Sequence, residues 1–97
     1  MIIVLRVFGN LANYFGGSKF YIELQKGASF RDLLDSIAMR WGRTLPPHIW
    51  DAEEKKFKLG VLFCDGQNDF TDDRIPLSNM QEIYLTLPMA GGSTSPQ

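Results

Sequence analysis

The segment from Ser29 to Gly42 constrains the fold of this chain more than any other. Six apolar residues recur in it with the spacing of one helix face, namely Phe30, Leu33, Leu34, Ile37, Ala38 and Trp41. Ser29 can cap the first turn together with Asp32, and Gly42 stands where a left-handed residue often ends a helix. A helix with one apolar face must cover an apolar partner, and we expect that partner to be a β-sheet.

Four segments with strand character flank this helix. Ile2 to Val7 is an almost unbroken apolar run, which predicts a strand buried on both faces. Phe20 to Leu24 alternates apolar and polar residues, as a half-buried strand antiparallel to the first would. Leu59 to Cys64 and Ile83 to Leu87 are predicted to be the remaining strands, and Leu11 to Lys19 is expected to be a turn region.

The order of these segments is strand, strand, helix, loop, strand and strand. The first and last strands are the most apolar, so they should be neighbours at the centre of the sheet. The economical arrangement is a mixed sheet of four or five strands with one main helix packed on one face. The prediction is therefore an α+β fold of the β-grasp, or ubiquitin-like, type. Residues 1–88 are expected to form this domain, and residues 89–97 a flexible C-terminal tail.

Residues 43–58 follow no regular pattern, and we expect Trp50 and Phe57 to attach this excursion to the edge of the domain. His48 is the only histidine of the chain. Because no second histidine and no cysteine stand at ligand spacing from it, a surface position is a better interpretation than a metal or catalytic site. No group of side chains in the sequence has the pattern of an enzyme's catalytic residues.

Composition and charge exclude several classes of function. The 97 residues have a formal net charge of −1 and contain no basic run, which argues against nucleic acid as the main partner. No segment has the apolar length needed to span a bilayer, and the N-terminus lacks the features of a signal peptide. The single cysteine, Cys64, fits a reducing cytosol. We therefore expect a cytoplasmic protein that binds no metal and no organic cofactor and has no membrane partner.

The end of the chain offers main-chain chemistry. Pro88 stops the last alternating run, because proline cannot donate to a sheet ladder, and Gly91 and Gly92 follow without side chains. A peptide as slender as this can enter a narrow channel in a partner and place a main-chain carbonyl beside reactive groups there. The alternative is an ordinary disordered terminus.

In the order and spacing of its segments, the chain resembles the MoaD/ThiS sulfur-carrier family, and among its members the small subunit of molybdopterin synthase. The resemblance covers residues 1–92. It rests on Phe8-Gly9 followed by Leu11, Ser29-Phe30-Arg31-Asp32-Leu33-Leu34, Val61-Leu62-Phe63-Cys64-Asp65-Gly66, Pro76-Leu77, Glu82-Ile83 and Pro88-Met89-Ala90-Gly91-Gly92.

The resemblance implies that Gly92 is the acyl donor and Gly91 the slender residue behind it. An E1-like adenylating enzyme would use ATP to convert the Gly92 carboxylate into an acyl-adenylate. Sulfur transfer would then give a thiocarboxylate for molybdenum or tungsten cofactor synthesis, with the large subunit of a synthase as acceptor. Phe8, on the exposed face of the sheet, would dock these partners, and Pro88, Met89 and Ala90 would stiffen the exit from the sheet and contact them.

One departure from the family bears on this chemistry. Sulfur carriers of this kind end at the second glycine, whereas Ser93 and four further residues follow Gly92 here. An amide has no carboxylate that could attack the α-phosphate of ATP, so we expect a protease to cleave between Gly92 and Ser93. Two other hypotheses stay open, namely a ubiquitin-like protein modifier that uses Gly92 as isopeptide donor and a non-covalent β-grasp interaction module.

Overall fold

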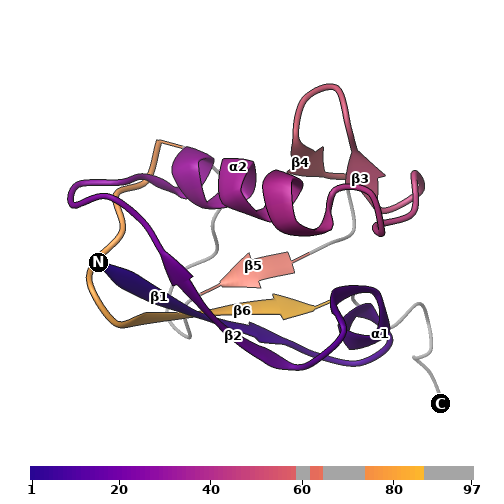
Figure 1. The fold of residues 1–97 in the computed structure, drawn as a ribbon, viewed down its shortest axis with the longest axis horizontal. Helices are drawn as coiled ribbons and strands as arrows, with labels where there is room; N and C mark the ends of the chain where they lie inside the picture. Colours follow the sequence, from indigo (N-terminus) through magenta and orange to yellow (C-terminus); the bar gives the residue numbers. More distant parts are fainter. Residues whose placement is uncertain (59–61, 65–73, 87–97) are drawn as a thin grey trace, which may run out of the picture.

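A four-stranded sheet with one long helix across one of its faces forms the body of the molecule (Figure 1). The computed structural model describes residues 1–58, 62–64 and 74–86 of the chain. The helices are α1 (Leu11–Phe15) and α2 (Phe30–Trp41). The strands are β1 (Ile2–Val7), β2 (Lys19–Glu23), β3 (Trp50–Asp51), β4 (Lys56–Phe57), β5 (Leu62–Cys64) and β6 (Gln81–Thr86).

The sheet has the strand order β2-β1-β6-β5, so the first and last strands are its two central strands, as predicted. β1 pairs antiparallel with β2 and parallel with β6, and Leu5 lies opposite both Phe20 and Ile83. β6 begins at Gln81, two residues before the predicted start, and Leu87 lies outside the described residues. Only residues 62–64 of the predicted third strand are described, and they form β5.

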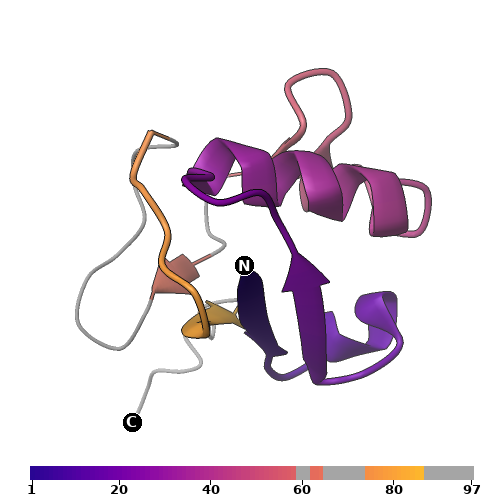
Figure 2. The same ribbon diagram turned by 60° about the vertical axis from the view of Figure 1, so that its left-hand side comes forward.

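Helix α2 covers one face of this sheet and closes the core against it (Figure 2). Five residues of the predicted stripe are buried, namely Phe30, Leu33, Leu34, Ile37 and Trp41. Ser29 and Asp32 form the predicted capping box, in which the Ser29 N–H donates to the Asp32 carboxylate at 2.8 Å. The cap satisfies donors that the first turn leaves without a partner, and the stripe fixes which side of the helix faces the sheet.

The helix ends at Trp41 with Gly42 next to it, as predicted, but the left-handed conformation expected for Gly42 is wrong. Gly42 has φ −55° and ψ −28°, which is the right-handed conformation. The chain continues in the same sense beyond Gly42, since the N–H groups of Thr44 and Leu45 both donate to the Trp41 carbonyl. The Ala38 carbonyl oxygen lies so close to Gly42 that a Cβ at position 42 would collide with it, which explains why this residue is a glycine.

The region after β1 also differs from the expected turn, because residues 11–15 form the short helix α1. Leu11 and Phe15, four positions apart, are both buried, so this helix attaches itself to the core through one face. Gly16 ends it with φ 81°, in the left-handed region that glycine adopts without strain.

The excursion after α2 forms the small hairpin of β3 and β4. Trp50 lies opposite Phe57 in this hairpin, with their ring centroids 4.8 Å apart, and Phe57 lies 5.3 Å from Phe63 of the core. These contacts confirm that Trp50 and Phe57 attach the excursion to the domain. The Arg31 guanidinium of α2 also holds the hairpin, because it donates to the carbonyls of Glu54 and Lys55. Within the described part of the chain, no helix has the length and apolarity that a membrane crossing requires.

Candidate functional site

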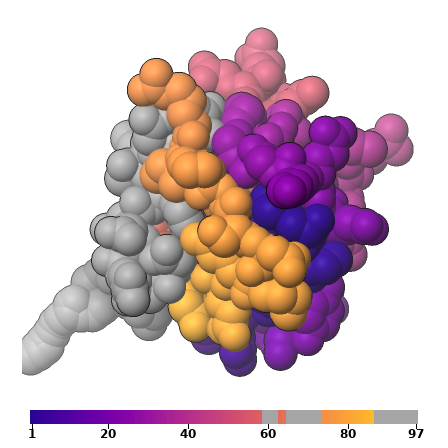
Figure 3. Space-filling view, turned by 90° about the vertical axis from the view of Figure 1, so that its left-hand side faces the viewer, coloured from indigo at the N-terminus to yellow at the C-terminus, as the bar shows by residue number. Residues whose placement is uncertain are grey.

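The parallel pairing of β1 and β6 fixes where the described part of β6 ends relative to β1. Parallel strands end at the same edge, and Val7 of β1 lies opposite Leu85 of β6. The Phe8 N–H extends this pairing by donating to the Leu85 carbonyl at 3.0 Å. Thr86, the last described residue before the tail, therefore lies beside Phe8. Figure 3 shows atoms of the segment 74–86 at the surface next to the N-terminal strand, although Leu77, Ile83 and Leu85 of this segment are buried.

Phe8 and Tyr84 form an aromatic pair at this end of the sheet. Their ring centroids are 5.8 Å apart, and Phe8 is 45% exposed. Ile83 and Leu85 point into the core with the residues of α2, so Tyr84 between them points to the other side of the sheet. We call this helix-free side the outer face. Phe8 therefore lies on the exposed face of the sheet, as the resemblance implied.

A charged pair continues the outer face toward the middle of the sheet. An Arg6 guanidinium nitrogen lies 3.7 Å from Glu82 Oε1, and the Tyr84 hydroxyl donates to the same oxygen at 3.0 Å. This hydrogen bond, and then the negative charge of Glu82, raise the pKa of the Tyr84 phenol above its ordinary value of 10.0. Tyr84 consequently stays a neutral hydrogen-bond donor throughout the neutral pH range.

The other predicted site residues fall in the C-terminal stretch. Pro88, Met89, Ala90, Gly91, Gly92 and Ser93 lie outside the described residues. His48 is exposed on the excursion, away from the core. In residues 1–58, 62–64 and 74–86, no group of histidine, cysteine and acidic side chains is arranged to hold a metal ion.

The described part of this site is suited to docking. Aromatic rings with exposed edges and a polar group nearby are typical of protein interfaces, because they exclude water while a donor fixes the orientation of the partner. The sequence analysis did not identify Arg6, Glu82 or Tyr84 as site residues. Side chains alternate between the two faces along β1 and β6, and this alternation could have placed all three on the outer face with Phe8. Arg6 lies two residues before Phe8, and Tyr84 lies opposite Arg6 across the strand pair.

Solved structures with the same fold were found for this chain. It is similar to SAMP1 from Haloferax volcanii, with a TM-score of 0.77, 15% identity, and coverage of 95% of this chain and 100% of that one. A second structure of this small archaeal modifier protein 1 gives a TM-score of 0.74 at 14% identity, covering 91% and 98% of the two chains.

A Pyrococcus furiosus protein assigned as molybdopterin converting factor, subunit 1, gives a TM-score of 0.65 at 17% identity, covering 92% and 99%. Comparison of the sequence with protein-family models found no match, and comparison with curated proteins found none either. At these identities the structural likeness establishes the fold, which is the predicted β-grasp with a mixed sheet and one main helix on it.

Proposed function

We propose that this protein is a sulfur carrier resembling the small subunit of molybdopterin synthase, and that it acts through the carboxylate of Gly92 after residues 93–97 are removed. One observation carries the proposal. Phe8 and Tyr84 form an aromatic pair on the outer face beside Thr86, six residues before the second glycine of Pro-x-x-Gly-Gly, and this position suits a docking surface. A partner that binds this surface holds the domain while the slender tail reaches that partner's reactive groups.

The chemistry takes place on the main chain in three steps. A protease first hydrolyses the amide between Gly92 and Ser93, which creates a carboxylate. A carboxylate oxygen then attacks the α-phosphate of ATP on an activating enzyme, and pyrophosphate leaves. Hydrosulfide from the activating system next attacks the acyl-adenylate carbonyl and displaces AMP, so that one carboxylate oxygen is replaced by sulfur.

The other participants follow from these steps. ATP is consumed on the activating enzyme, so the carrier itself needs no bound cofactor. The large subunit of a synthase accepts the sulfur for molybdenum or tungsten cofactor synthesis, in the cytoplasm. The names of two of the similar structures, a small archaeal modifier protein and a molybdopterin converting factor subunit, support a partner of this kind.

Pyrophosphate exchange on the cognate activating enzyme tests the carrier chemistry. The chain ending at Gly92 should support ATP–pyrophosphate exchange, and the full chain, kept free of protease, should support none, because it has no Gly92 carboxylate. A chain ending at Gly91 is the matched control for tail length. Exchange with the intact full chain would contradict the role given to cleavage, and no exchange with the chain ending at Gly92 would contradict the carrier role.

A protein modifier is the second candidate, and the likeness to SAMP1, with TM-scores of 0.77 and 0.74, favours it. Activation would be the same, but a lysine amine of a target would attack the Gly92 carbonyl and form an isopeptide. Covalent conjugates that survive reduction and denaturation in the native host would support the modifier. A thiocarboxylate without conjugates would support the carrier.

A further inference from the structure

Strand β2 forms one edge of the sheet, at the side away from β5 (Figure 2). Among the described residues, β1 is its only strand partner, so its second side faces outward. An open strand edge carries a row of N–H and C=O groups that can pair with another strand. Edge strands normally have features that prevent such pairing, such as repulsive charges. The side chains of β2 show whether this edge has them.

The hydrogen bonds between β1 and β2 fix which backbone groups face outward. The Met1 amino group and the Leu24 N–H each donate to the carbonyl of the other residue, and the Val7 N–H donates to the Ser18 carbonyl. In an antiparallel pair such hydrogen-bonded positions alternate, so the even-numbered residues from 18 to 24 face β1. The N–H and C=O groups of Lys19, Tyr21 and Glu23 therefore face the open side.

These three residues carry exposed side chains on the outer face. Tyr21 is 59% exposed, and the Lys19 ammonium lies 5.6 Å from its ring centroid. Within the described part of the chain, neither Lys19 nor Glu23 forms an ion pair. The edge thus has one uncompensated cation at its start, one uncompensated anion at its end, and an exposed aromatic ring at its midpoint.

We infer that β2 is an interface for a second copy of this chain, through antiparallel pairing of β2 with β2 about a two-fold axis at Tyr21. In this register Tyr21 faces the partner's Tyr21, and Lys19 faces the partner's Glu23 in each of two symmetric places. The backbone groups of Lys19, Tyr21 and Glu23 all face the open side of β2. Each of these residue pairs can therefore form reciprocal N–H···O=C bonds between the two copies. The sheet then runs without interruption through both copies.

Other registers are less favourable for identifiable reasons. A shift by one residue would oppose backbone groups that β1 already engages. A shift by two residues, with the axis at Phe20 or Ile22, would keep open backbone groups opposite each other but would lose both Lys19–Glu23 pairs. A two-fold axis at Lys19 or at Glu23 would place like charges directly opposite each other, and so would parallel pairing, which is destabilising between neighbouring strands. Many edge strands discourage pairing through repulsive charges. In β2 the charges have opposite signs and lie at equal distances from Tyr21, so the edge complements its own copy.

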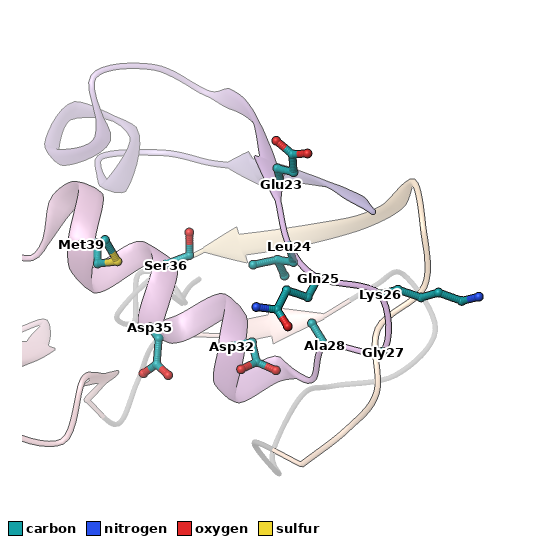
Figure 4. A pocket seen from close by; sticks show the side chains of 10 residues that line it. All are labelled: Glu23, Leu24, Gln25, Lys26, Gly27, Ala28, Asp32, Asp35, Ser36 and Met39. Carbon is teal, nitrogen blue, oxygen red and sulfur yellow. The ribbon is translucent and has the colours of Figure 1, made fainter.

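The helix side of this edge leaves space for the partner. A cavity of about 390 Å³ opens between α2 and the end of β2. Its lining residues include Glu23, Leu24 and Met39 (Figure 4), and Met39 is 89% exposed. One short strand buries little surface, so the dimer should be weak and should form only at high protein concentration. The partner copy pairs on the side of β2 that faces away from β1, so β2 lies between the partner copy and the Phe8–Tyr84 pair.

Charge reversal tests this interface. Sedimentation equilibrium of the full chain, from micromolar to millimolar concentration, should show a monomer–dimer equilibrium. Lys19→Glu and Glu23→Lys should each weaken self-association by about tenfold, because each places like charges opposite one another. An equimolar mixture of the two variants should associate as strongly as the wild type, and so should the double variant Lys19→Glu/Glu23→Lys. These two rescues exclude misfolding as the reason for a loss.

Three results would overturn the proposal. They are a wild-type chain that stays monomeric at millimolar concentration, single variants that associate as well as the wild type, and a mixture that associates no better than its components. Amide hydrogen exchange gives a second measurement that is specific for the register. Increasing concentration should slow exchange at Lys19, Tyr21 and Glu23 while leaving Phe20 and Ile22 unchanged, and slowing at other surface amides alone would contradict this pairing.

Discussion

Phe8 and Tyr84 are the side chains on which the proposed docking depends. Phe8 was identified from the sequence through the family resemblance, and the structure places it on the outer face with 45% exposure. Tyr84 was not identified, although the alternation of its strand places it on the same face. Glu82 contacts both Tyr84 and Arg6, and it could be recognised as their shared partner only when the register between β1 and β6 was known.

Phe8→Ala should weaken binding of the synthase large subunit by about tenfold or more, since exposed aromatic residues at the centre of an interface carry much of its binding energy. Tyr14→Ala is the matched control, because Tyr14 is also an exposed aromatic, at 37%, but lies on α1. Titration calorimetry measures both. Equal affinities of the Phe8 and Tyr14 variants would show that the partner binds elsewhere.

Glu82→Gln should lower the pKa of Tyr84, because the carboxylate that accepts its hydrogen bond and repels its phenolate is the cause of the raised pKa. A raised pKa stabilises the protonated phenol in the folded state. The stabilisation is complete below the ordinary phenol pKa and disappears as the pH rises through the folded-state pKa. Titration of phenolate absorbance, with Tyr84→Phe to assign the signal, measures the shift. An unchanged titration would contradict the assigned cause.

Elements with a long periodic pattern could be predicted, and short ones could not. Helix α2 was predicted with its cap and its buried face because twelve residues repeat the same apolar spacing. Helix α1 has five residues, too few for a period to be visible, and its strongest signal was the Gly16 that ends it. The strands β3 and β4 have two residues each, so only Trp50 and Phe57 indicated that the hairpin packs against the domain.

Ile37→Ala should destabilise the fold by about 2–5 kcal/mol, because Ile37 is fully buried between α2 and the sheet and its loss leaves a cavity. Met39→Ala on the exposed side of the same helix should change stability by less than about 0.5 kcal/mol. Urea unfolding followed by circular dichroism compares the two. Similar midpoints for both variants would contradict the orientation of α2.

For the whole molecule, the order of the elements was enough to predict the β-grasp fold, because one amphipathic helix and two central apolar strands leave few other arrangements. The site divides into two parts. The sheet end with Phe8 is described, whereas the division into residues 1–88 and 89–97 and the roles of Gly91 and Gly92 stay predictions from the sequence. No side-chain pattern could indicate the reactive group, because that group belongs to the main chain.

Intact mass spectrometry of the protein isolated from its native host tests the central claim most directly. We predict a chain that ends at Gly92 and carries one sulfur in place of one oxygen under sulfur-replete conditions, with the modification located on the C-terminal glycine by fragmentation. A full-length, unmodified chain as the only species under the same conditions would contradict the account.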